Sequence, residues 1–291
     1  MTTLQKKIDF AVVLRVKRAN PNGDPLNGNR PRTDYENYGE MTDVCIKRKI
    51  RDRLLERWKD DGKKEDDGNM IFVQSDDRKA DEHKSLRARA DAILGNKFGS
   101  SETAKLACKR WFDVRAFGQL FALPKKARVG EEDGDGDTGI SIGIRGPVTV
   151  QSAFSVEPIE VTSNQITKSV NAQDTKGGKR GSDTMGMKHS VDKGVYVFFG
   201  SMNPQLAEKT GFSDVDAEAI KKVLPRLFEN DESSARPSGS MEVLKVIWWK
   251  HNGKPSQYSA AKVHRSLKVQ QDGSIETDDL EGLKPEILEG F

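Results

Sequence analysis

The chain has 291 residues, of which 35% are hydrophobic and 32% are charged. A chain of this length and composition can bury a substantial core, and we expect one large domain. The formal net charge of +3 does not by itself indicate a polyanion-binding protein, but residues 1–59 contain 14 Lys and Arg against 8 Asp and Glu, so a basic surface is expected at the amino-terminal end.

Several classes of site are disfavoured. Only two cysteines occur, Cys45 and Cys108, and neither belongs to a pattern typical of a disulfide framework or a zinc site. The four histidines are scattered without metal-ligand spacing. No apolar run approaches the roughly 20 residues of a membrane helix, and the first residues lack a signal-peptide hydrophobic segment. We therefore expect a cytoplasmic protein with no cofactor and no membrane partner.

The first predicted element is a strand over residues 8–18. Its apolar face contains Val12, Leu14 and Val16, which alternate by the period-two rule. Arg15 and Lys17 fall on the opposite face. The pattern predicts a strand with a core side and a cationic side.

A long loop over residues 19–41 follows the strand, with Arg18 just before it. The loop begins with the turn-forming string Asn20, Pro21, Asn22, Gly23, Asp24 and Pro25. Such a string leaves a sheet sharply and presents backbone amides and short polar side chains together. It could hold a phosphate chain or serve only as a turn.

A helix is predicted over residues 42–59, with Thr42 as its N-cap and Asp43 in its first turn. Its buried stripe contains Ile46, Ile50, Leu54 and Trp58, with Leu55 beside them. Lys47, Arg48 and Arg51 lie on the other side. Lys47 and Arg51 repel each other unless an anion lies between them. The alternative is a solvated basic face.

The next segment alternates between charged and apolar stretches. Residues 60–69 read as a charged turn, residues 70–73 as a short strand, and residues 76–92 as a charged loop or exposed helix. A helix is predicted from about residue 101 to residue 121. Arg115 and Gln119 are its polar exceptions, and we expect both to face outward.

Residues 130–139 contain two incomplete motifs. Three glycines match GxGxxG, but the string is acidic and lies outside a strand-to-helix unit. Its aspartates resemble the start of an EF-hand, yet Thr138 and Ile144 occupy positions that require Gly and Glu. We expect an acidic loop.

The rest of the chain alternates strands with insertions. Strand character runs from Ile140 to about Val161, and residues 163–190 form a basic, glycine-rich insertion with five Lys and Arg against two Asp. Such an insertion is either disordered or orders on a polyanion. A helix over residues 214–228, a linker over 230–240 and a buried strand over 243–250 follow.

Four segments together resemble a known family. They are RVKRANPNGDP after the first strand, DVRAFGQ at 113–119, GPVTVQSAFSVEPIE at 146–160 and TMGMKHSVDKGVYVFFG at 184–200. In this order they are similar to the CRISPR type I-C Cascade backbone subunit, a crRNA-binding member of the RAMP superfamily. The resemblance covers about residues 8–250.

The resemblance implies an α+β fold in which residues 1–291 form a single domain. Its core would be a modified RNA-recognition-motif (ferredoxin-like βαββαβ) sheet, with large insertions that form fingers and a thumb-like hairpin at residues 163–190. Members of the family stack along one crRNA into a helical filament and flip a base out near each thumb. The implied partners are crRNA, target DNA paired with it, neighbouring copies and other Cascade subunits.

The implied function is non-catalytic. One protein must accept every guide sequence, so it must hold the backbone, and phosphate contacts supply affinity without sequence information. The RNA-binding candidates are Arg18, Asn20, Asn22, Gly23, Lys47, Arg48, Arg51, Arg115, Gln119, Lys168, Met185, Lys188 and His189. The last four belong to the thumb-like insertion.

Two alternatives remain open. Related type III backbone subunits cleave RNA with an aspartate in the loop after the first strand, where Asp24 lies here. A lone carboxylate needs a metal or a strained substrate to cut RNA, so we expect Asp24 to cap the turn. A small-molecule enzyme is the second alternative, although no nucleophile, metal set or cofactor motif is recognisable.

Overall fold

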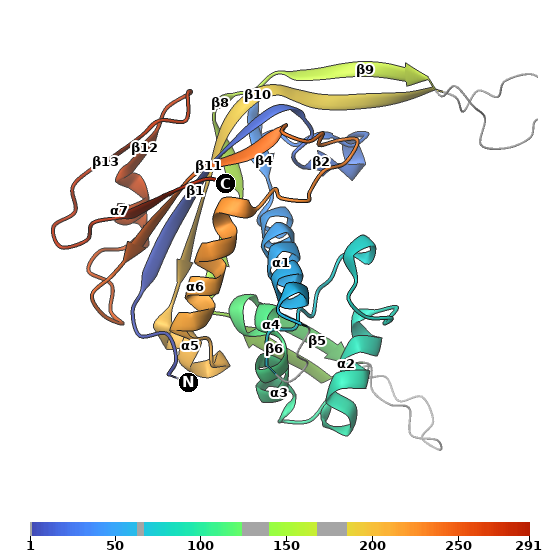
Figure 1. Cartoon of the computed structure of the whole chain (residues 1–291), viewed down its shortest axis with the longest axis vertical. Coiled ribbons are helices and arrows are strands. Elements are labelled where there is room, and N and C mark those ends of the chain that lie inside the picture. The colour runs from blue at the N-terminus through green and yellow to red at the C-terminus, as the bar shows by residue number, and fades with distance from the viewer. Residues whose placement is uncertain (1, 63–66, 124–139, 168–184) are drawn as a thin grey trace, which may run out of the picture.

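The computed structural model describes residues 2–62, 67–123, 140–167 and 185–291. Its centre is an eight-stranded antiparallel sheet (Figure 1). Six strands lie side by side in the order β14 (Glu286–Glu289), β11 (Met241–Lys250), β1 (Ile8–Ala19), β10 (Met185–Met202), β8 (Ala153–Pro158) and β4 (Tyr38–Met41). The other two, β7 (Val148–Val150) and β9 (Val161–Thr167), pair with separate parts of β10. A mixed α+β fold is therefore confirmed.

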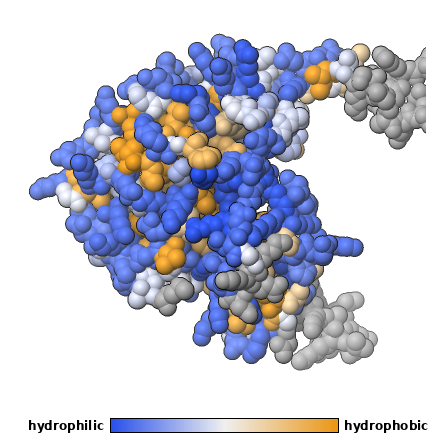
Figure 2. All heavy atoms as spheres, viewed as in Figure 1, coloured by the Kyte–Doolittle hydropathy of each residue, from blue (hydrophilic) through white to orange (hydrophobic). Residues whose placement is uncertain are grey.

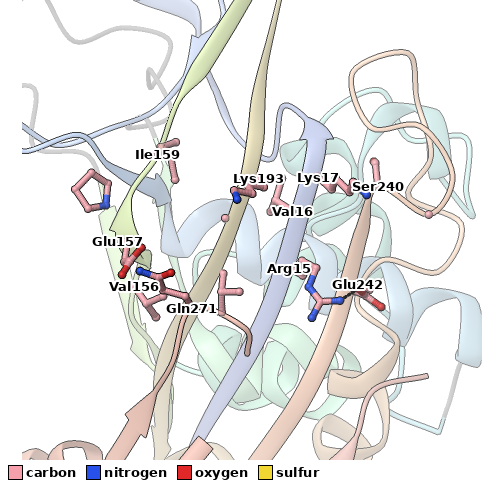
Figure 3. A pocket seen from close by; sticks show the side chains of 14 residues that line it. Arg15, Val16, Lys17, Val156, Glu157, Ile159, Lys193, Ser240, Glu242 and Gln271 are labelled. Carbon is pink, nitrogen blue, oxygen red and sulfur yellow. Dashed lines mark hydrogen bonds and ion pairs between the residues drawn. The ribbon is translucent and has the colours of Figure 1, made fainter. Parts of the chain in front are cut away.

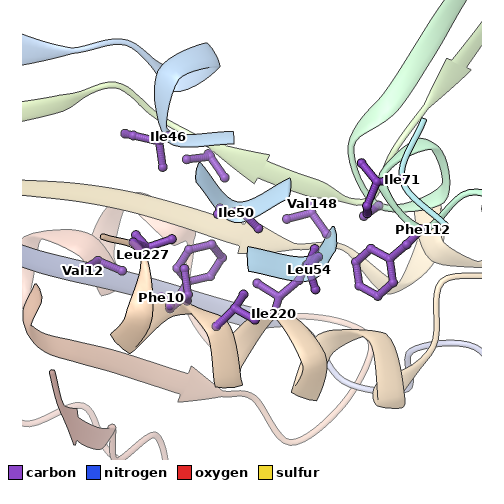
Figure 4. Packing of buried hydrophobic residues seen from close by; sticks show 14 of the residues in the cluster. Phe10, Val12, Ile46, Ile50, Leu54, Ile71, Phe112, Val148, Ile220 and Leu227 are labelled. Atoms are coloured by element: carbon purple, nitrogen blue, oxygen red, sulfur yellow. The ribbon is translucent and has the colours of Figure 1, made fainter. Parts of the chain in front are cut away.

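One face of the sheet is covered by helices α1 (Asp43–Asp60) and α6 (Asp214–Val223) (Figure 1). The predicted N-cap is confirmed, because Thr42 Oγ1 accepts a hydrogen bond from the Cys45 amide at 3.3 Å. The predicted stripe of α1 is buried, as Figure 4 shows for Ile46, Ile50 and Leu54. These side chains pack with the alternate β1 residues Phe10 and Val12 in the main core. No helix in the described ranges is both long and apolar enough to span a bilayer.

The opposite face of the sheet is partly covered by the carboxyl-terminal region. Helix α7 (Ala260–Arg265) and the hairpin of β12 (Leu267–Val269) and β13 (Ile275–Thr277) pack there. Their apolar side chains bury Ala11 and Val13 of β1 in a second core cluster. The predicted cationic side of β1 is therefore restricted to the last residues of the strand, where the side chains of Arg15 and Lys17 are accessible to solvent.

A buried polar cluster joins β1 to the end of β11. Asp9 is fully buried and accepts hydrogen bonds from His251 Nε2 at 2.9 Å and from Lys7 Nζ at 2.8 Å. Burial raises the pKa of Asp9, but the hydrogen bonds from His251 and Lys7, together with the nearby His264 ring, outweigh it and hold the pKa well below its ordinary value. Asp9 is therefore a charged anchor within the core.

Residues between α1 and β7 build a separate lobe beside α1. It contains α2 (Leu86–Leu94), α3 (Thr103–Arg110), α4 (Phe112–Phe117) and the β5–β6 pair (Gly118–Leu123 and Ile140–Arg145). The single helix predicted from residue 101 to 121 is wrong: Trp111 has extended backbone between α3 and α4, and Gly118 at φ 82° ends α4. In place of the predicted strand 70–73, Met70 forms only an isolated bridge to Trp111. The acidic loop 130–139 lies outside the described residues.

An arm extends from the sheet where β9 pairs with the outer half of β10, in register from Val161 opposite Val191 to Thr167 opposite Met185 (Figure 1). It forms the stem of the predicted basic insertion. Lys168 and the residues up to 184 lie outside the described residues. Figure 2 shows apolar side chains on the outer part of this arm, amid a hydrophilic surface; Ile166, Met185 and Met187 are exposed there.

Candidate nucleic-acid interface

The loop after β1 is fastened to the start of α1. Asn22 Oδ1 accepts hydrogen bonds from the Thr42 amide at 2.9 Å and from Thr42 Oγ1 at 3.0 Å. Because Thr42 is the N-cap of α1, these bonds fix the loop against the first turn of the helix. The loop and the helix are therefore close together, as predicted. The side-chain oxygen of Asn22 is used for this contact within the protein.

Asn20 and Gly23 both pack against Asn29 within the loop. The Asn20 side chain is buried and donates from Nδ2 to the Asn29 carbonyl at 2.6 Å. A Cβ at Gly23 would lie 2.1 Å from Asn29 Oδ1 and 3.0 Å from the Asn29 carbonyl oxygen, so a larger residue would require the Asn29 side chain to move. The expectation that the Asn20 side chain is presented at the surface is wrong, because the loop folds back on residue 29. Gly23 is partly exposed.

Asp24 caps a short turn, as expected. Its carboxylate accepts from the Leu26 amide at 3.2 Å, at the start of the 3-10 turn Pro25–Asn27, and forms an ion pair with Arg32 at 3.2 Å. In the part of the chain that the structure describes, no three His, Cys, Asp or Glu side chains gather to hold a metal ion. The geometry thus assigns Asp24 a structural contact within the loop.

Free cations lie on both sides of this loop. Arg18 is exposed, at φ 52°, and Arg48 is exposed on α1. Neither side chain forms a hydrogen bond or an ion pair among the described residues, although the charge of Arg48 acts on the carboxylate of Asp52 one turn later. Lys47 is partly exposed and pairs with Asp43 one turn earlier, at 2.9 Å. Such an exposed pair contributes little to stability and leaves the ammonium group accessible to another anion.

Arg51 differs from Arg48 although both lie on α1. Its Nε donates to Asp113 Oδ2 at 3.0 Å, and its guanidinium group lies over the Phe117 ring. Asp113 is buried and also accepts from the amides of Phe72 and Val73. The prediction that Arg51 shares an open basic face with Lys47 is wrong, because a buried carboxylate from α4 draws it inward.

Arg115 also points inward. It is 8% exposed and pairs with Asp216 through two hydrogen bonds, at 3.0 and 2.7 Å. The expectation that Arg115 faces outward is therefore wrong. Gln119 lies on β5 and is partly exposed, and it lines a shallow hollow of ≈ 640 Å³ together with Lys47. The structure thus brings Gln119, and not Arg115, next to the basic stripe of α1.

The predicted thumb residues separate onto two faces of the arm. Successive side chains of a strand alternate between faces, so Met185 and His189 lie on one face, with Met187 between them, and Lys188 lies on the other. The face with Met185 and His189 is also the face of Val191, which belongs to the main core. The arm thus presents Met185 and His189 on one side and Lys188 on the other.

Arg30 is a surface residue that the sequence analysis did not select. It lies on the short strand β3 (Arg30–Pro31), which pairs with β2 (Gly23–Asp24). Its Nη1 donates to Ser163 Oγ at 2.8 Å, and Ser163 Oγ lies 2.8 Å from His189 Nδ1. Arg30 thus joins the loop to the base of the arm. Its position in a Gly/Pro/Asn-rich loop offered no periodic signal.

The loop is therefore fastened to the start of α1 through Asn22 and to the base of the arm through Arg30. A sequence model of the family described as CRISPR-associated protein Cas7 matches residues 6–284. The chain belongs to the Cas7 family. It is 25% identical over 254 residues to the CRISPR-associated protein Cas7 of Haloferax volcanii, and the match covers 84% of this chain and 71% of that protein. The resemblance noted in the sequence is thereby confirmed at the level of the Cas7 family.

Two solved structures are similar to this Cas7 family member. One is described as a CRISPR RNA-guided surveillance complex, pre-nicking, with 16% identity, a TM-score of 0.47 and coverage of 88% of this chain and 81% of that chain. The other is a CRISPR RNA-guided surveillance complex, with 17% identity, a TM-score of 0.43 and coverage of 92% and 77%.

Proposed function

We propose that this Cas7 family member is a non-catalytic backbone subunit of a type I-C Cascade effector and that it holds crRNA by its sugar-phosphate backbone. Family membership supports the proposal, as does the surface formed by the loop, α1 and the arm. The observation that carries it is the Asn22–Thr42 contact, which holds the loop beside the exposed basic stripe of α1.

The free cations supply affinity without reading bases. The side chains of Arg48 and Arg18 are exposed and form no hydrogen bond or ion pair in the described ranges, and Lys47 has only a partly exposed ion pair with Asp43. Phosphate contacts from such side chains fix the position of a strand but contain no sequence information. Base edges turned away from α1 then remain available for pairing with target DNA.

We infer that the sheet is a modified RNA-recognition-motif palm. Taken in chain order, β1, α1, β8, β10, α6 and β11 follow the pattern βαββαβ, and their strands are neighbours in the order β11-β1-β10-β8. The lobe between α1 and β7 is then an insertion that corresponds to the fingers. The arm of β9 and β10 corresponds to the thumb.

The arm supports assembly along the guide. Met185 and Met187 are exposed on one face of the arm, and apolar side chains of this kind can pack against an unstacked base. We propose that neighbouring copies stack along one crRNA in the cytoplasm, with each arm near the guide. We propose that Lys188, on the other face of the arm, contacts an adjacent subunit or strand.

The proposal is tested by the RNA content of the purified chain. We expect guide-length RNA to co-purify and to dissociate as salt rises, because binding depends on phosphate contacts. The double variant Lys47→Gln/Arg48→Gln removes two of them, so the slope of log K against log salt should fall by about 1.4, or roughly 0.7 per phosphate on a single strand.

The matched control is Lys105→Gln/Lys109→Gln, which removes the same charge from helix α3 of the lobe and leaves the basic residues of α1 unchanged. The control should retain the salt dependence of the parent chain. A parent chain that purifies as a monomer free of nucleic acid would contradict the proposal and favour the small-molecule enzyme. Equal RNA affinity in Lys47→Gln/Arg48→Gln and the parent would remove α1 from the interface.

A further inference from the structure

A second pair of cations lies on the opposite face of the sheet from α1. Lys17 of β1 and Lys193 of β10 are directly opposite each other in the antiparallel register. Both are exposed, and neither side chain forms a hydrogen bond or an ion pair in the described ranges. Like charges directly opposite across two strands destabilise a sheet. The arrangement therefore favours an anion placed between them.

The two lysines line a hollow of ≈ 590 Å³ in the sheet surface (Figure 3). Ser240, at the start of β11, lines the same hollow beside Lys17. Ser240 is 9% exposed, and its hydroxyl group has no hydrogen-bond partner within the described structure. A buried hydroxyl without a partner costs free energy unless a ligand or water satisfies it. The hollow therefore offers both charge and an unused hydrogen-bonding group.

The remaining charges border these two lysines. Arg15, two residues before Lys17 on the same face of β1, pairs with Glu242 at 2.9 Å, where both side chains are about half exposed. Glu157 of β8 lies at the far side of the hollow from Ser240, beside Gln271 (Figure 3). Lys17 and Lys193 thus lie between Glu242 on one side of the hollow and Glu157 on the other.

We propose that this hollow binds the phosphodiester backbone of a second nucleic-acid strand, distinct from the guide. The inference rests on the proposed function, which supplies the nucleic-acid context. A guide on the α1 side cannot reach Lys17 and Lys193 of the same subunit, because the sheet lies between them. A single strand can place one phosphate between Lys17 and Lys193, whereas a broad acidic protein surface would also meet Glu157 and Glu242.

The test uses the full chain loaded with a guide RNA that has no complementarity to oligothymidylate. Fluorescein-labelled oligothymidylate is the probe, and its anisotropy is followed as sodium chloride is raised. The variant Lys17→Gln/Lys193→Gln should bind it roughly tenfold more weakly at low salt, with a slope reduced by about 1.4. Oligothymidylate should raise the unfolding temperature of the parent chain and leave that of the variant unchanged.

The control variant is again Lys105→Gln/Lys109→Gln, which has the same net charge and should bind as the parent does. Guide-RNA content is measured in the same preparations. Retained guide RNA with equal oligothymidylate binding in parent and Lys17→Gln/Lys193→Gln would overturn this site alone. Absence of guide RNA from every preparation would overturn the proposed function and this site with it. A parent chain that binds no oligothymidylate would likewise overturn the site.

Discussion

The exposed stripe of α1 and the interior between α1, α4 and α6 both contain arginines, but their surroundings are opposite. The Arg48 side chain forms no hydrogen bond or ion pair within the described structure and faces solvent. Arg51 and Arg115 each meet a buried carboxylate, Asp113 and Asp216. The same residue type is therefore available for a ligand in one region and committed to the fold in the other.

The difference follows from the free energy of desolvation. A buried guanidinium group needs a carboxylate with good geometry, and removal of one partner leaves the other charged and unpaired. An exposed guanidinium group is solvated and exchanges water for phosphate at little cost. Substitutions in the two regions should consequently separate stability from RNA binding.

The largest effect is expected for Arg115→Ala. It leaves Asp216 buried without its bidentate partner, and the free energy of unfolding should fall by about 3–5 kcal/mol. Chemical denaturation measures the change. The control Arg48→Ala should alter the unfolding free energy by less than about 0.5 kcal/mol. Equal effects of the two substitutions would contradict the division between the regions.

Asp9→Asn extends the comparison to a third buried carboxylate. It removes charge-assisted hydrogen bonds with His251 and Lys7, so we expect a loss of about 2 kcal/mol at pH 7. The pKa of Asp9 in the folded chain lies below its ordinary value of 3.8. Its contribution is therefore fully present above that value and is lost as pH falls toward the lowered pKa.

Unfolding free energies measured between pH 7 and pH 2 check this sign. The parent chain should lose stability in the acid range more steeply than Asp9→Asn, because only the parent has this carboxylate to protonate. If the unfolding free energies of the two chains fell in parallel with pH, the charged carboxylate of Asp9 would not stabilise the core.

Asn22→Ala tests whether the loop must be fastened to α1 for binding. It removes the acceptor of two Thr42 hydrogen bonds and should cost about 1–2 kcal/mol of stability. RNA affinity should also fall, because the loop would no longer be fastened beside α1. Asn22→Asp retains an acceptor and should recover stability while its added negative charge still weakens RNA binding. Full RNA affinity in Asn22→Ala would separate the loop from the interface.

The smallest effect is expected for Asp24→Ala. Its pair with Arg32 is partly exposed, so the loss should be about 0.5–1 kcal/mol. RNA cleavage by the assembled complex should not change, and gel electrophoresis of labelled RNA measures it. A cleavage activity that disappears in Asp24→Ala would support the endoribonuclease alternative and overturn the non-catalytic assignment.

The sequence alone determined the elements whose signals are local. Strand β1 and helix α1 follow from apolar residues at periods of two and about four, and Thr42 follows from the short-range chemistry of an N-cap. The family resemblance likewise depended on local strings in chain order. The prediction of one helix over residues 101–121 missed the break at Trp111 and the change to strand β5 at Gly118. The apolar residues between 111 and 121 have a spacing that is compatible with one continuous helix and also with a short helix followed by a buried strand.

Only the tertiary structure decided which basic residues remain free. The partner of Arg51 lies 62 residues away in sequence and that of Arg115 lies 101 residues away, so no local pattern connects them. The opposition of Lys17 and Lys193 likewise depends on the register of two distant strands. Charge is written in the sequence, but its availability to a ligand depends on burial and on the carboxylates that folding brings beside it.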